Sequence, residues 1–223
     1  MPDVNEFHEL VKKGNLEGVR AALADNPSLL NETNQAGQSA FLLAKYYQQE
    51  TVANELMGRK PSLDIFALCV AGDVSRVLAE LKDHPERLHA HSSDGWTPLH
   101  LAAFFGQPDL VDALVNQGGD LEGRSTNSSK NTPLHAGTAG GSAEVVRRLL
   151  QHGAKPNSRQ EGGWTALHSA AQAGNREMVE ALLAHGADVN VRAENNQSPL
   201  DLALTRGHQE IVALLEQLGA KLQ

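Results

Sequence analysis

The strongest constraint on this chain is a short motif that returns along it at a nearly constant interval. Four copies occur, as Thr-Pro-Leu-His at 97–100 and 132–135, Thr-Ala-Leu-His at 165–168 and Ser-Pro-Leu-Asp at 198–201. Their spacings are 35, 33 and 33 residues, and a glycine keeps the same intervals, at Gly106, Gly141, Gly174 and Gly207. A period of this length predicts an array of small structural repeats, each of which buries its apolar face only against its neighbours.

The N-terminal part of the chain carries a second, longer repetition. Residues 7–57 align on residues 65–115 without a gap when they are shifted by 58 positions. A unit of 58 residues has room for one full repeat and one shortened repeat, and the short one lies between Ser39 and Asp64. We therefore predict a single domain, 1–223, of about seven repeats, at approximately 4–36, 37–63 (shortened), 64–94, 95–130, 131–163, 164–196 and 197–223.

Each repeat is predicted to hold two short helices. A hydroxyl residue followed by proline, as at Thr97-Pro98, favours a helix start, because the hydroxyl caps free N–H groups and proline suits the first turn. Gly106 supplies the left-handed conformation in which many helices end. In the second helix, Leu110 and Leu114 lie on one apolar face, which must pack against a neighbouring repeat.

The 33-residue period with Thr-Pro-Leu-His resembles the ankyrin repeat, in which a turn is followed by two antiparallel helices. Residues 183–190, Leu-Ala-His-Gly-Ala-Asp-Val-Asn, also look like the end of that family's second helix and the turn that follows it. The resemblance covers nearly the whole chain and is weakest at 58–66. It implies an all-α solenoid of paired antiparallel helices with hairpin-like turns. It also implies protein–protein recognition through the concave face, as an adaptor, scaffold or inhibitor, without catalysis.

Charge and composition exclude several other classes. The net charge of −8 argues against nucleic-acid binding, which needs clustered Lys and Arg. Cys69 is the only cysteine, so an internal disulfide and a cysteine-based zinc site are excluded. The sequence shows no secretory signal and no apolar stretch long enough for a membrane span. We therefore expect a cytoplasmic monomer that binds another protein and makes no membrane contact.

The polar residues suggest no catalytic or metal site. His100, His135 and His168 recur once per repeat, but stacked repeats hold equivalent side chains too far apart to share one metal ion. In repeats of the family that this chain resembles, that histidine is a structural hydrogen-bonding residue near the turn. No nucleophile is paired with a base, and no phosphate-binding loop is present. We therefore expect neither an enzyme nor a bound cofactor.

The aromatic residues indicate a binding surface. In ankyrin-like repeats the exposed recognition positions are the residue before the motif's Thr and the residues seven and eight after it. Six of the nine aromatic residues (two Trp, two Tyr and five Phe) fall at these positions. The candidate partner-binding residues are Tyr46, Tyr47, Asp94, Trp96, Phe104, Phe105, Trp164 and Arg206. Exposed aromatic rings often form binding hot spots, so we expect the rings at these positions to be substantially solvent-accessible.

Two alternatives for the aromatic residues stay open. The rings could pack locally against the neighbouring turns and bind no partner. A second possibility is an aromatic cage that reads a cationic or modified peptide side chain, built from Asp94, Trp96, Phe104 and Phe105. A cage needs rings that face one another across a gap, whereas a protein-binding surface needs rings spread over one face.

Overall fold

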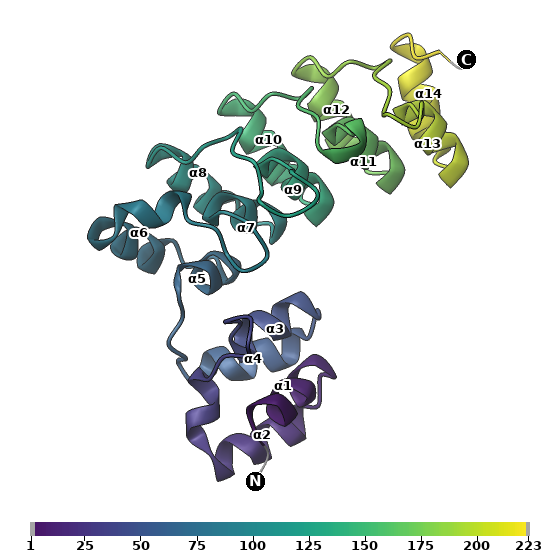
Figure 1. Ribbon diagram of the computed structural model, residues 1–223. Coiled ribbons are helices and arrows are strands. Elements are labelled where there is room, and N and C mark those ends of the chain that lie inside the picture. Colours follow the sequence, from purple (N-terminus) through teal and green to yellow (C-terminus); the bar gives the residue numbers. More distant parts are fainter. Residues whose placement is uncertain (1–2, 222–223) are drawn as a thin grey trace. The chain divides into compact units, whose positions relative to one another are not determined.

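The computed structural model describes residues 3–221, and this part of the chain is largely helical. It contains fourteen α-helices and three 3-10 helices, with an isolated β-bridge between Thr33 and Ser39 and no β-strand among the described residues. The chain divides into two compact units, residues 1–71 and 72–223. Figure 1 shows the helices in chain order.

The two units differ in their number of helices. The first unit holds α1 Val4–Lys12, α2 Leu16–Asp25, η1 Pro27–Asn31, α3 Ala40–Tyr46, α4 Glu50–Gly58 and α5 Ile65–Ala71. The second unit holds α6 Val74–Asp83, η2 Pro85–His89, α7 Pro98–Phe104, α8 Pro108–Asn116, α9 Pro133–Gly140, α10 Ala143–Gln151, η3 Glu161–Gly163, α11 Ala166–Ala173, α12 Arg176–Ala184, α13 Pro199–Arg206 and α14 Gln209–Gln217. Each of the seven predicted repeat ranges therefore contains two α-helices. That the repeats form a single domain stays a prediction.

Within the second unit the helices stack in two layers (Figure 1). The first helices of successive repeats, α7, α9, α11 and α13, contact one another in series, and the second helices, α8, α10, α12 and α14, do the same. Within the first unit, α1 contacts α2 and α3, and α3 contacts α4 and α5. The predicted all-α fold of stacked helix pairs is confirmed.

The core of the second unit lies between its two layers. Leu114 of α8, Leu149 of α10 and Leu182 of α12 occupy equivalent places in successive repeats, and all three are fully buried. Ala103 and Ala171 are also fully buried, and their small side chains let neighbouring first helices approach closely. Burying a leucine side chain contributes roughly 1.5–3 kcal/mol, so each layer depends on the other for its stability.

The recurring histidines join one repeat to the next. The Nδ1 atom of His100 lies 2.7 Å from the hydroxyl oxygen of Thr97, and its Nε2 donates to the backbone carbonyl of Asn131 at 3.0 Å. His135 and His168 make the same two kinds of contact within and between their repeats. Burial lowers the pKa of His100 to about 4, so the ring is neutral at neutral pH. The predicted structural role of these histidines is confirmed.

The first helices end at residues in the left-handed backbone conformation, as the sequence predicts. Gly174 caps α11 with a φ of +68°, and Gly207 caps α13 with a φ of +76°. In the shortened repeat the equivalent residue is Gln48, which adopts a φ of +56° after α3. A residue with a Cβ atom is strained in this region, so the shortened repeat keeps the turn at a conformational cost.

Candidate protein-binding surface

Three of the predicted site residues form one cluster at α7. The ring centroids of Trp96 and Phe104 are 4.9 Å apart and the rings meet edge to face. Phe104 meets Phe105 in the same way at 5.2 Å. We refer to these three residues, Trp96, Phe104 and Phe105, as the aromatic cluster. Each of them is half-buried, so each ring presents part of its surface to solvent.

The geometry of α7 explains why these rings meet. Trp96 directly precedes the N-cap Thr97, while Phe104 ends the helix and Phe105 caps it. His100 and Phe104 are four residues apart and share one helix face, and the Trp96 ring stacks on His100 at a centroid distance of 6.3 Å. The Nε1 atom of Trp96 is buried and has no hydrogen-bond partner among residues 3–221. A buried indole N–H normally finds an acceptor. The local packing of Trp96 departs from this rule and leaves its indole donor unsatisfied within the described residues.

Trp164 repeats part of this arrangement beside α11. Its ring tilts over His168 at a centroid distance of 5.5 Å and is half-buried. The expectation of substantial exposure is therefore met only in part for Trp96, Phe105 and Trp164, because these residues pack partly against the protein. It is met in full for Tyr47, which is 51% exposed.

Tyr46 and Tyr47 belong to the first unit. Tyr46 is the last residue of α3 and is half-buried, and Tyr47 is the C-cap of the same helix. The ammonium group of Lys12 lies 5.7 Å from the centroid of the Tyr47 ring, within the range of a cation–π contact. One side of the exposed Tyr47 ring therefore lies next to the positive charge of Lys12.

The two charged candidates, Asp94 and Arg206, are both exposed. Asp94 is held through its backbone, since its carbonyl accepts a hydrogen bond from Nδ2 of Asn127 at 3.0 Å. Arg206 is the last residue of α13 and makes no ion pair within residues 3–221. The carboxylate of Asp94 and the guanidinium of Arg206 are therefore both accessible to a charged group of a partner.

The structure also links three arginines that sequence reasoning missed. Arg124, Arg159 and Arg192 stand at equivalent places in the turns before α9, α11 and α13. Nη1 of Arg124 donates to the carbonyl of Lys130 at 2.9 Å and to the carbonyl of Arg159. Nη1 of Arg159 donates in turn to the carbonyl of Arg192 at 2.9 Å. These arginines share the 35- and 33-residue spacings of the repeated motif, which is the signal that could have found them.

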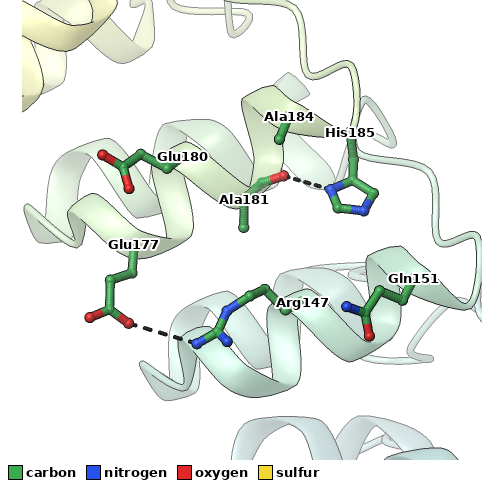
Figure 2. Close-up of a pocket in the computed structure, with 7 residues that line it drawn as sticks. All are labelled: Arg147, Gln151, Glu177, Glu180, Ala181, Ala184 and His185. Atoms are coloured by element: carbon green, nitrogen blue, oxygen red, sulfur yellow. Dashed lines mark hydrogen bonds and ion pairs between the residues drawn. The ribbon is translucent and has the colours of Figure 1, made fainter.

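A wide hollow lies between the second helices α10 and α12 (Figure 2). It has a volume of about 510 Å³ and is lined by Arg147, Gln151, Glu177, Glu180, Ala181, Ala184 and His185. Arg147 and Glu177 form an ion pair of 3.8 Å across it, and Nδ1 of His185 donates to the carbonyl of Ala181 at 2.9 Å. The lining contains no serine, threonine or cysteine side chain.

Cys69 and the possible metal ligands lie among the described residues. Cys69 is fully buried, and burial raises the pKa of its thiol, so it is unreactive. Within residues 3–221, no three His, Cys, Asp or Glu side chains are grouped so that they could hold a metal ion. No helix in the same range combines the length and the apolar character that crossing a bilayer requires.

This molecule is a helical repeat protein. Its helix pairs stack in series, histidines link its turns, and aromatic rings lie half-buried at its surface. The chain belongs to the ankyrin repeat family. The family model described as ankyrin repeats (3 copies) matches residues 65–160 and 157–223.

Curated relatives carry similar sequence within longer proteins. Ankyrin repeat and SAM domain-containing protein 6 from Rattus norvegicus is 41% identical over 108 residues, which are 48% of this chain and 12% of the relative. Target of rapamycin complex 2 subunit AVO2 from Saccharomyces cerevisiae is 27% identical over 173 residues, 71% of this chain and 40% of the relative. E3 ubiquitin-protein ligase KEG from Arabidopsis thaliana is 28% identical over 170 residues, 72% of this chain and 9% of the relative. The chain thus spans less than half the length of each of these relatives.

Proposed function

We propose that this chain is a non-catalytic protein–protein interaction module that binds a partner protein through the concave face formed by its first helices and turns. The observation that carries the proposal is the aromatic cluster, in which Trp96, Phe104 and Phe105 adjoin one another and each presents part of its ring to solvent. Rings fixed by mutual contact form a rigid apolar surface, so little conformational entropy is lost when a partner covers them. Truncating an aromatic hot spot of this kind costs a complex about 2 kcal/mol or more.

The family supports the same function. Ankyrin repeats generally act as protein–protein interaction modules, and one relative is named as a subunit of a complex. The proposal includes the remaining candidate residues as parts of the partner-binding surface, namely Tyr46, Tyr47, Asp94, Trp164 and Arg206. That the chain acts as a cytoplasmic monomer, without binding nucleic acid or a membrane, is a prediction from its sequence.

An aromatic cage for a cationic side chain fits the cluster less well. A cage needs aromatic walls separated by a gap that admits an ammonium group. The rings of Trp96 and Phe104 are in edge contact at a centroid distance of 4.9 Å, and Phe104 and Phe105 are in similar contact at 5.2 Å. Rings in direct contact favour a broad apolar interface.

An affinity pull-down from a lysate of the source cells tests the proposed function. The baits are the unchanged chain and a double variant of the aromatic cluster, Trp96→Ala with Phe105→Ala. Leu204→Ala is the matched control, because Leu204 is an apolar residue of α13 that is 38% exposed and lies outside the cluster. We expect partner bands that the unchanged chain and the control retain and the double variant loses. Identical bands for all three folded baits, checked by thermal melting, would contradict the proposal.

A further inference from the structure

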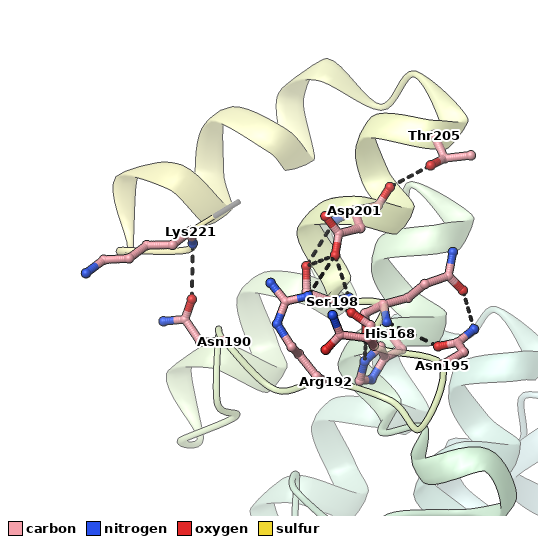
Figure 3. Close-up of polar contacts among 10 residues, drawn as sticks. His168, Asn190, Arg192, Asn195, Ser198, Asp201, Thr205 and Lys221 are labelled. Carbon is pink, nitrogen blue, oxygen red and sulfur yellow. Dashed lines mark hydrogen bonds and ion pairs between the residues drawn. The ribbon is translucent and has the colours of Figure 1, made fainter. Parts of the chain in front are cut away.

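The turns before α9, α11 and α13 carry three arginines with a shared structural role but different electrostatic settings. Nη1 of Arg192 lies 3.3 Å from Oδ2 of Asp201, and Figure 3 shows these two residues beside Ser198. Arg124 and Arg159 make no ion pair with a carboxylate among residues 3–221, and their guanidinium groups donate to backbone carbonyl oxygens. Within the described residues, neither guanidinium group is therefore paired with a carboxylate, although the whole chain has a net charge of −8.

A change within the repeated motif explains the difference. The fourth position of the motif is Asp201 in the last copy, whereas His135 and His168 occupy it in the two copies before. Burial, assisted by the charge of Arg124, lowers the pKa of His135 to about 4, so this histidine is neutral at neutral pH. A neutral imidazole cannot compensate an arginine in the way that the carboxylate of Asp201 compensates Arg192.

Arg124 and Arg159 also line one open hollow. It has a volume of about 260 Å³ and is lined by Arg124, Lys130, Arg159, Gln160, Glu161 and Glu194. Lys130 and Glu161 form an ion pair of 3.4 Å, which leaves Glu194 as the only other acid of the lining beside the two arginines. Both arginines are exposed, so the guanidinium N–H groups that are not bonded to carbonyls can be reached from solvent.

The hollow adjoins the turns that carry the two tryptophans. Nη1 of Arg159 donates at 3.3 Å to the backbone carbonyl directly before Trp164. A backbone hydrogen bond of 2.9 Å joins the turn of Arg124 to the turn of Trp96. A partner peptide that covers Trp96 or Trp164 with one residue can therefore reach Arg124 or Arg159 with a neighbouring residue.

We propose that the hollow between Arg124 and Arg159 binds a carboxylate side chain, so that the partner presents an acidic peptide segment with Asp or Glu beside an apolar anchor. This inference rests on the proposed function, because it names the chemistry of the same partner. Guanidinium groups bind carboxylates through paired, charge-assisted hydrogen bonds. A nucleic acid is a poorer ligand, because its long row of phosphates would extend beyond the hollow over a chain with a net charge of −8, whereas a single carboxylate side chain contacts only the hollow.

Selection from a random peptide library on the purified chain tests the inference. The recovered peptides should be enriched in Asp and Glu. Replacing these acids in a labelled peptide by Asn and Gln should weaken its binding roughly tenfold or more, measured by fluorescence polarisation. Because only the peptide is changed in this measurement, the fold of the chain is the same throughout. Added salt should also weaken binding, because it screens exposed charges.

Variants of the chain locate the binding site. Arg124→Gln with Arg159→Gln should weaken binding of a selected peptide roughly tenfold. The matched control is Arg192→Gln, which should leave binding unchanged because Asp201 already compensates that arginine. Arg124→Lys with Arg159→Lys removes the guanidinium hydrogen bonds and keeps the charge, so it should bind more tightly than the glutamine pair. Thermal melting reports whether each variant is folded.

The possible results separate the two proposals. Peptides that require Trp96 but show no excess of acids, or that bind equally to the arginine double variant, overturn the acidic-segment inference and leave the proposed function standing. A selection that yields no peptide dependent on Trp96 or on the arginines overturns both. A single-stranded DNA oligonucleotide that binds the chain and is lost in the arginine double variant overturns the choice of a peptide ligand.

Discussion

The backbone of Phe104 fills the space that a side chain at Gly140 would need. The Cα atom of Phe104 stands 2.9 Å from the point where a Cβ atom of residue 140 would lie, which is closer than such atoms approach in folded proteins. Helices α7 and α9 therefore meet backbone to backbone beside the aromatic cluster. Only glycine permits this approach, so the small residue at 140 reflects packing between repeats.

We predict that Gly140→Ala destabilises the chain by about 1–3 kcal/mol, because the added methyl group forces α7 and α9 apart. Urea denaturation measures this loss. Gly58→Ala is the matched control, since Gly58 ends α4 with no atom within 4 Å of its Cβ position. That change should be neutral or stabilise the chain by up to about 1 kcal/mol. Equal effects at the two glycines would show that α7 and α9 separate without cost.

Substitutions at Gly174 and Gly207 distinguish two ways in which a side chain at a helix end destabilises the fold, namely backbone strain and a steric clash. Both have positive φ, but a Cβ atom at Gly174 would lie 2.6 Å from Nδ1 of His208, whereas one at Gly207 has no atom within 4 Å. Gly207→Ala should therefore cost only the left-handed strain of about 1–2 kcal/mol. Gly174→Ala should cost about 1 kcal/mol more, because it also disturbs the hydrogen bond from Nε2 of His208 to the carbonyl of Gln172 at 3.0 Å. Thermal or urea denaturation of both variants decides this, and an equal loss would contradict the contact with His208.

Gln48 is a site where glycine should improve the fold. Its φ of +56° is strained for a residue with a Cβ atom, and its side chain is exposed. Gln48→Gly should therefore stabilise the chain by about 0.5–1 kcal/mol. The adjacent Gln49→Gly should have the opposite sign, because Nε2 of Gln49 donates to the carbonyl of Lys12 at 3.2 Å. Denaturation midpoints of the two variants that move in the same direction would contradict this prediction.

The buried histidines should make stability depend on pH. Burial lowers the pKa of His100 and of His135 from 6.5 to about 4. Below pH 6.5 the unfolded chain binds protons that the folded chain excludes, so stability is present above that pH and is lost as the pH falls toward 4. Between about pH 7 and about pH 5, each histidine should remove about 2 kcal/mol from the free energy of unfolding.

A variant without these titrating groups provides the control for the pH dependence. His100→Gln with His135→Gln should be less stable at neutral pH, because it lacks the contacts between repeats. Its stability should nevertheless change less between about pH 7 and about pH 5. The carboxylates Asp73 and Asp201, whose pKa values lie below 3.8, titrate at lower pH. Urea denaturation curves with the same slope against pH for both proteins would show that the histidines are not the cause.

Much of the fold could be predicted because helix starts and ends are set by neighbours in sequence. Thr97 caps the helix that follows it, and Gly174 ends its helix in the left-handed conformation, as their residue types predict. The candidate site was harder to predict. The positions of Trp96 and Trp164 in the repeat suggested exposed rings, but both rings are half-buried because they fold over His100 and His168.

The sequence by itself determined the number and order of the helix pairs, the buried leucines and the role of the recurring histidines. The helix pairs and the buried leucines follow from spacing, since capping and helix periodicity act over a few residues and the same pattern recurs in each repeat. The role of the histidines follows from the resemblance of the repeated motif to the ankyrin repeat. Only the tertiary structure decided that the rings of Trp96 and Phe104 touch, that α7 leaves no room for a side chain at Gly140, and that Arg192 is paired while Arg124 is not. These relationships depend on atoms of residues distant in sequence, whose separations are set by how the helices and turns stack.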